Sequence, residues 1–152
     1  LETFAYMPPR QVLDGLPAED ATRRVAGTPH SILEICAHLN FWQDWFLKRV
    51  DGVAEPVVTS AAAGWPSVAG RTWEPERDAF FAGLERAVAI SEDAGRLTAR
   101  VEPAIEFPPL AHFTVRDALM HVALHNAHHL GQIVTLRQIM GLWPPPDGAF
   151  TW

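Results

Sequence analysis

Two long, mostly apolar segments, each opened by a helix-capping motif, constrain the fold of this chain more than any other feature. In a capping box, a hydroxyl at the N-cap and an acidic side chain three residues later satisfy amides that the first turn leaves free. The two pairs that fit this pattern are Ser31 with Glu34 and Thr114 with Asp117. Apolar residues then recur at helical spacing. The pattern predicts helices over residues 32–50 and 114–141, and the second is followed by three consecutive prolines.

A third amphipathic helix is predicted over residues 74–97, where apolar side chains alternate with charges at helical spacing. Prolines at 8, 9 and 17 predict two short helices in the first 30 residues. Residues 51–73 mix Gly, Pro and small residues without periodicity, and a loop of this length in a compact domain often covers a functional site. Alternation typical of strands is missing from the sequence. We therefore expect one all-α domain over residues 1–152, built as a small antiparallel helix bundle.

Composition excludes several classes of protein. A net charge of −6 argues against a nucleic-acid partner, since such proteins usually carry a basic surface. Cys36 is the single cysteine, which excludes an internal disulfide framework and fits a reducing compartment, so we expect a cytoplasmic protein. We see no apolar run long enough for a membrane span and no signal peptide. Because Leu1 is not a methionine, we expect that an upstream piece, such as part of a first helix, precedes it.

Histidines interrupt the apolar seam of the last predicted helix. At 100° per residue, His121, His125 and His129 fall within about 80° of one another on its core-facing side. A buried imidazole without a partner costs roughly 1 to 3 kcal/mol, so each needs something to bind. Two histidines at positions i and i+4 can direct ring nitrogens at one zinc ion. Either His121 with His125, or His125 with His129, fits this spacing.

A third ligand has to come from another helix. His38 is the candidate, because its side of the 32–50 helix also carries bulky apolar residues and therefore faces the core. Three neutral nitrogens leave one coordination position open, the pattern of catalytic zinc. The competing interpretation is a structural bundle in which these histidines are hydrogen-bonded core residues without metal.

Two segments of the sequence resemble a known family. The stretches "HSILEICAHLNFWQDWFLKRVDG" and "HVALHNAHHLGQIVTLRQIMG" are similar to the DinB-like (YfiT-like) superfamily of metal-dependent hydrolases, and the resemblance covers most of residues 15–143. It implies His38, His125 and His129 as metal ligands, with His121 as a neighbour. It also implies a four-helix bundle with a crossover connection, often dimeric, although the usual long first helix is short or absent here.

From the same resemblance we expect one divalent transition metal, zinc or nickel. The reaction implied is hydrolysis, or transfer to a low-molecular-weight thiol, with a small-molecule substrate. The competing function is a non-catalytic metal-binding or ligand-binding protein of a stress response. The sequence itself gives no general base and no substrate signature.

Other side chains are candidates for supporting roles. Gln132 can hydrogen-bond a metal ligand, and Trp42 can line the pocket or simply fill the core. Glu34 can orient His38 or act as a base, but we favour its capping role. Cys36 lies about 160° around the helix from His38, which makes it a packed small residue rather than a nucleophile.

Overall fold

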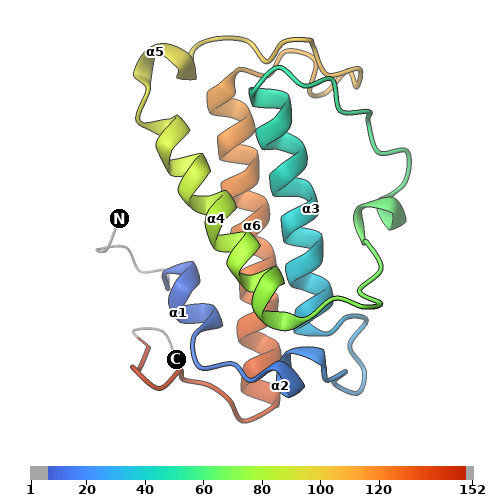
Figure 1. The fold of residues 1–152 in the computed structure, drawn as a ribbon, viewed down its shortest axis with the longest axis vertical. Helices are drawn as coiled ribbons and strands as arrows, with labels where there is room; N and C mark the ends of the chain where they lie inside the picture. The colour runs from blue at the N-terminus through green and yellow to red at the C-terminus, as the bar shows by residue number, and fades with distance from the viewer. Residues whose placement is uncertain (1–6, 150–152) are drawn as a thin grey trace.

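Three long helices form the body of the molecule in the computed structural model, which describes residues 7–149 (Figure 1). They are α3 (Ile32–Val50), α4 (Trp73–Ser91) and α6 (Val115–Ile139). Short helical segments complete the order: α1 (Pro9–Leu13), α2 (Ala18–Thr22), the 3₁₀ turn η1 (Ala61–Gly64) and α5 (Ala94–Leu97). Residues 7–149 contain no strand, only an isolated bridge between Arg100 and Thr114. The predicted all-α class is confirmed.

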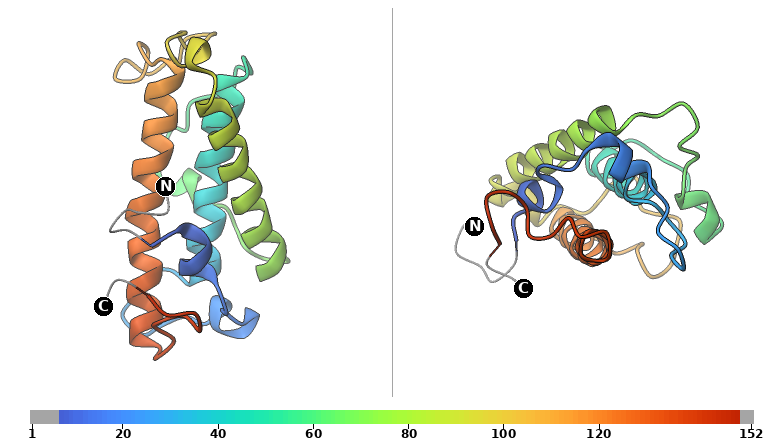
Figure 2. Two further views of the ribbon diagram at one scale, coloured as in Figure 1. Left: turned by 90° about the vertical axis from the view of Figure 1, so that its left-hand side faces the viewer. Right: turned by 90° about the horizontal axis from the view of Figure 1, so that it is seen from below.

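The long helices pack in two layers. Helices α3 and α4 lie in front of α6 in Figure 1, and the view from below in Figure 2 places the three at the corners of a triangle. Helix α1 occupies only the lower part of the fourth position, beside α6. Within residues 7–149, α1 is short, and it does not fill the upper half of that position.

Local sequence explains where the elements begin. Both predicted capping boxes are present, with the hydroxyls of Ser31 and Thr114 accepting from the amides of Glu34 and Asp117. Helix α1 begins with Pro9, and α2 follows Pro17 at its N-cap. The predicted short helices are thus confirmed as well.

The prediction of one continuous helix over residues 74–97 is wrong in one respect, because the structure breaks this segment into two helices. Helix α4 ends at Ser91, and α5 is a separate single turn that begins after Asp93. The backbone of Asp93 is extended, and its carboxylate accepts a hydrogen bond from the amide of Arg96. Asp93 thus acts as a new N-cap, a role in which Asp is strongly preferred, and apolar periodicity does not reveal it.

The apolar core falls into two clusters along the bundle, and the histidines lie where these meet on α6. On α6, one cluster includes Leu130 and buried residues after it, and the other includes Val122 and buried residues before it. His125 and His129 occupy the turns between them. The chain thus places polar rings at the one level of this helix where apolar packing is discontinuous.

A long loop of residues 51–72 passes over α3 on the side that carries His38 (Figure 1). The indole nitrogen of Trp45 donates to the carbonyl of Pro56, 2.8 Å away, which fixes the start of this loop. Further along, η1 approaches the middle of α3. None of the helices within residues 7–149 has the length and apolar character needed to cross a membrane.

Candidate metal site

Three histidines from two helices converge in the structure. His38 stands on the second turn of α3, while His125 and His129 are one turn apart on α6. The Nε2 atom of His38 lies 3.1 Å from the Nε2 atoms of both His125 and His129. Together they form a group able to hold a metal ion. The fold thus brings together the same three residues that the family resemblance implies.

Hydrogen bonds to the far side of two rings fix which nitrogen carries the proton. The Nδ1 atom of His38 is 2.6 Å from the carbonyl oxygen of Gly64, which can only accept. The Nδ1 atom of His129 is 2.8 Å from the Oε1 atom of Gln132. In both rings Nδ1 therefore donates, and the neutral ring presents an unprotonated Nε2. Such outer hydrogen bonds orient histidines in metal sites.

The contact between His38 and His129 favours a cation. Two unprotonated Nε2 atoms 3.1 Å apart cannot hydrogen-bond to each other, and their lone pairs repel. A metal ion that both nitrogens bind removes this conflict. Metal–nitrogen bonds of about 2.0 to 2.1 Å at a tetrahedral angle place two nitrogens about 3.3 Å apart, close to the observed spacing. The residues present therefore fit a divalent metal.

Burial keeps these imidazoles neutral. His38 and His129 are buried and His125 is half-buried. Desolvation lowers the pKa of His38 to about 4 and the pKa of His125 to about 3, with neighbouring histidines adding to the effect. The pKa of His129 is also lowered by burial. Neutral imidazole is the form that binds metal.

The electrostatic influences on the three rings come from neighbouring imidazoles. Within the described part of the chain, the charged neighbours that shift their pKa values are all other histidines, and no carboxylate is among them. A metal bound here would keep its full positive charge. This environment differs from sites in which Asp or Glu neutralises the ion.

An indole from the long loop covers one side of the site. The ring of Trp65 stacks on His38 with centroids 3.8 Å apart and planes 10° apart, and it meets His129 edge-on at 5.8 Å. The ring of His30 stacks on Trp65 at 3.7 Å. Trp65 is thus held between two imidazoles, and the loop forms a wall of the candidate site.

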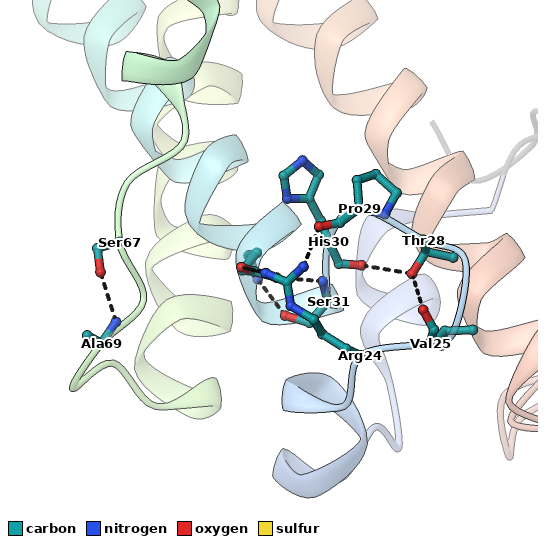
Figure 3. Close-up of polar contacts among 9 residues, drawn as sticks. Arg24, Val25, Thr28, Pro29, His30, Ser31, Ser67 and Ala69 are labelled. Atoms are coloured by element: carbon teal, nitrogen blue, oxygen red, sulfur yellow. Dashed lines mark hydrogen bonds and ion pairs between the residues drawn. The ribbon is translucent and has the colours of Figure 1, made fainter.

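Hydrogen bonds hold the segment that carries His30. Figure 3 shows the guanidinium of Arg24 reaching the carbonyl of Pro29, and the hydroxyl of Thr28 between the carbonyls of Val25 and His30. Because the segment leads directly into the capped start of α3, the position of the His30 ring is tied to the helix that carries His38.

Gly64 is required by close packing against α3. A Cβ atom added there would lie 2.6 Å from the indole nitrogen of Trp42, which is shorter than a real contact. The glycine lets the loop backbone approach closely enough for its carbonyl to reach His38. Trp42 also meets His125 edge-on, with ring centroids 6.4 Å apart. The indole of Trp42 therefore borders the site and limits how closely the loop backbone can approach α3.

The other candidate residues take different positions. The ring of His121 is parallel to that of His125, with centroids 6.5 Å apart, and it packs against Phe46. Gln132 contacts His129 and also His128, whose Nε2 atom lies 3.3 Å from its amide nitrogen. Both residues belong to the surroundings of the triad, and His121 is exposed, so its predicted core-facing position is wrong.

Glu34 and Cys36 stand apart from the triad. The carboxylate of Glu34 accepts from the amide of Ser31 and pairs with Arg24, so it is occupied by capping. The thiol of Cys36 is buried, and desolvation raises its pKa to about 12, which suppresses the reactive thiolate.

Sequence reasoning missed three contributors to this site: Gly64, Trp65 and His30. The aperiodic 51–73 segment indicated that a loop covers a site, but no local pattern identifies which of its residues reach α3. His30, immediately before the cap of α3, carries no signal of its own.

Comparison with known proteins gave one match. A family model described as the DinB superfamily matches residues 7–133, most of the chain, which confirms the resemblance noted in the sequence. No curated protein matches. A search of solved structures also found no match.

Proposed function

Because the chain belongs to the DinB superfamily, we propose that it binds one divalent transition metal ion, zinc or nickel, through His38, His125 and His129. The observation that carries this proposal is the contact between two unprotonated Nε2 atoms, 3.1 Å apart, on His38 and His129. Hydrogen bonds to Gly64 and Gln132 hold both rings in the tautomer that a metal needs.

The neutral ligand set favours an anion in the remaining coordination position. Three imidazoles contribute no charge, and the charged neighbours of these rings include no carboxylate. In a partly buried site this leaves a net positive charge, which attracts a hydroxide, a thiolate or a carboxylate. A small molecule that brings such a group is the substrate class that fits.

We assign the protein to metal-dependent hydrolysis of a small molecule or to transfer of a small-molecule thiol. When bound, the metal would lower the pKa of a water or thiol at the open position and so supply a nucleophile. The chain's own residues orient the histidine rings and shield the site from bulk water. Gly64 and Gln132 fix the histidine rings, while Trp42 and Trp65 border the site with apolar surface that limits access of bulk water.

The competing function is a non-catalytic bundle that only sequesters metal. The two differ in the fourth ligand: an enzyme leaves this position to water or substrate, whereas a sequestering protein fills it with a protein group. Among the described residues, the only group placed to hold a metal consists of three histidines. This favours the enzyme.

The deciding experiment is elemental analysis of protein purified without chelator, followed by anomalous scattering from its crystals. We expect about one metal atom per chain, with an anomalous peak bounded by the three Nε2 atoms and solvent in the fourth position. A fourth protein ligand would favour sequestration. Protein that contains no metal and takes up neither zinc nor nickel would overturn the proposal.

A further inference from the structure

A short chain of hydrogen bonds leads from the triad to the surface of α6. The Nδ1 atom of His129, whose ring is buried, lies 2.8 Å from the Oε1 atom of Gln132. The amide nitrogen of Gln132 in turn lies 3.3 Å from the Nε2 atom of His128, which is exposed. Residues three and four positions apart are neighbours on a helix, so Gln132 reaches both rings at once. A ligand of the candidate site is thereby connected to a side chain in solvent.

Two arrangements of protons satisfy this chain. A side-chain amide accepts at its oxygen and donates from its nitrogen, while a neutral imidazole donates from one nitrogen and accepts at the other. With Oε1 toward His129, as in the structure, that ring carries its proton on Nδ1, and the amide donates to an unprotonated Nε2 of His128. With the amide turned over, both rings carry their proton on Nε2 instead. Both rings are neutral in either arrangement, and Gln132 ties their two tautomers together.

The two arrangements differ in their ability to bind metal. In the first, the unprotonated Nε2 atom of His129 is free to bind a cation. In the second, the N–H at this position donates to the Nε2 atom of His38, 3.1 Å away. This hydrogen bond takes the place of a metal–nitrogen bond and removes the repulsion between the two lone pairs. The second arrangement therefore favours the metal-free site.

His38 has no corresponding choice, because its outer partner is a backbone group. The carbonyl oxygen of Gly64 can only accept, so the Nδ1 atom of His38 donates in both arrangements. The amide of Gln132, in contrast, presents either its oxygen or its nitrogen after a half-turn about its last side-chain bond. The tautomer of His129 is thus set by the group that holds this amide from outside, and that group is His128.

We propose that His128 is a positioning residue of the metal site, which acts through Gln132 on the tautomer of His129. The inference rests on the proposed metal function and deepens it. A group at position 128 that only accepts hydrogen bonds holds the amide in the metal-binding orientation, and one that only donates turns it over. Because such coupling is reciprocal, metal at the triad also sets the tautomer of the exposed His128 ring.

Nitrogen NMR of the imidazole rings tests the coupling in the absence of metal. It distinguishes the two neutral tautomers, and at pH 8, above the ordinary histidine pKa of about 6.5, neutral rings dominate. In His128→Glu, whose carboxylate only accepts, His129 should carry its proton on Nδ1. In His128→Lys, whose ammonium only donates, His129 should carry it on Nε2. The position is exposed, so both variants should keep the wild-type circular dichroism spectrum.

The control combines each of these substitutions with Gln132→Leu. Without the amide, a charge at position 128 acts on His129 only through space, so the tautomer of His129 should be the same in both double variants. The exposed ring of His112 lies outside the chain of hydrogen bonds and should be unaffected throughout. The same His129 tautomer in His128→Glu and His128→Lys would overturn the proposal. A difference that persists with Gln132→Leu would overturn it as well.

Zinc binding provides the second readout. We expect His128→Lys to bind zinc roughly 10-fold more weakly than His128→Glu, at the low end of the effect of disturbing an outer hydrogen bond. With Gln132→Leu most of this difference should vanish, because only the direct effect of the charge is left. In the wild-type chain, zinc should move the proton of His128 to Nδ1, and it should not do so in Gln132→Leu.

These measurements separate the role of His128 from the metal function itself. Equal zinc affinities of His128→Glu and His128→Lys, or a difference of the same size with Gln132→Leu, would overturn the role of His128. Protein that binds no zinc in any form would refute the proposed metal function, whereas the tautomers of the metal-free variants would still decide whether His128 acts on His129.

Discussion

The Nδ1 atom of His38 lies 2.6 Å from the carbonyl oxygen of Gly64, so a residue of the long loop orients a candidate metal ligand of α3. This contact requires the loop backbone to lie directly against the helix. The loop is thereby part of the site, and its fit can be tested without touching any of the three histidines.

Replacing Gly64 with Ala should weaken metal binding. The new Cβ would lie 2.6 Å from the Trp42 indole nitrogen, so the loop has to move and the Gly64 carbonyl leaves His38. Losing an outer hydrogen bond of this kind typically costs about 10-fold to 100-fold in metal affinity. Competition with a chromophoric chelator measures the change. Gly95→Ala, where the added Cβ makes only an ordinary contact at 3.4 Å, is the matched control and should bind as wild type.

Replacing His125 with Ala should abolish stoichiometric metal. His125 belongs to either pair of histidines with i, i+4 spacing on α6, and its Nε2 atom lies 3.1 Å from that of His38. Two remaining nitrogens are too few to retain the ion through purification. Elemental analysis of the variant is the measurement. Full occupancy in folded His125→Ala protein would show that the metal, if present, binds elsewhere.

The two outer histidines of α6 should behave differently. His129→Ala should lose the metal, because the Nε2 atom of His129 lies 3.1 Å from that of His38 in the wild-type chain. His121→Ala should keep it, because the His121 ring packs on Phe46 and its centroid lies 6.5 Å from that of His125. The pair serves as its own control, since both changes remove one imidazole from α6. Retention in His129→Ala together with loss in His121→Ala would rule out the proposed ligand set.

Most of the helical framework could be predicted from the sequence because its signals are local. Capping pairs such as Ser31 with Glu34 act within one turn, and the apolar spacing fixes which side of each helix is buried. The break at Asp93 was missed because a single side-chain hydrogen bond to Arg96, rather than periodicity, ends one helix and starts the next.

The candidate site was only partly predictable, for a related reason. The spacing on α6 left two pairs of histidines open, and the family resemblance chose between them. The contributions of Gly64 and Trp65 depend on how a loop without periodicity packs across α3. Such a contact is set by tertiary packing, and no motif within the loop encodes it.

Metal should stabilise the fold at neutral pH, and this benefit should fade in acid. Burial lowers the pKa of His38 to about 4 and that of His125 to about 3, whereas both are near 6.5 in the unfolded chain. Between these values the unfolded chain binds more protons than the folded one. The stability of the metal-free protein is therefore fully present above about pH 6.5 and declines as the pH falls toward 4 and then 3. Protons also compete with metal for the same nitrogens.

Thermal melting with and without chelator at pH 7.5 and pH 5 measures both effects. Metal at a hundredfold excess over its dissociation constant adds about 2.7 kcal/mol, which in a domain of this size raises the Tm by roughly 5 to 10 °C. We expect metal to raise the Tm by this amount at pH 7.5 and by less at pH 5. In chelator, the Tm should be lower at pH 5 than at pH 7.5. His125→Ala should show no effect of chelator at either pH. If the wild-type Tm at pH 7.5 were equally indifferent to chelator, the histidines would be hydrogen-bonded residues of an ordinary core, and the metal assignment would be wrong.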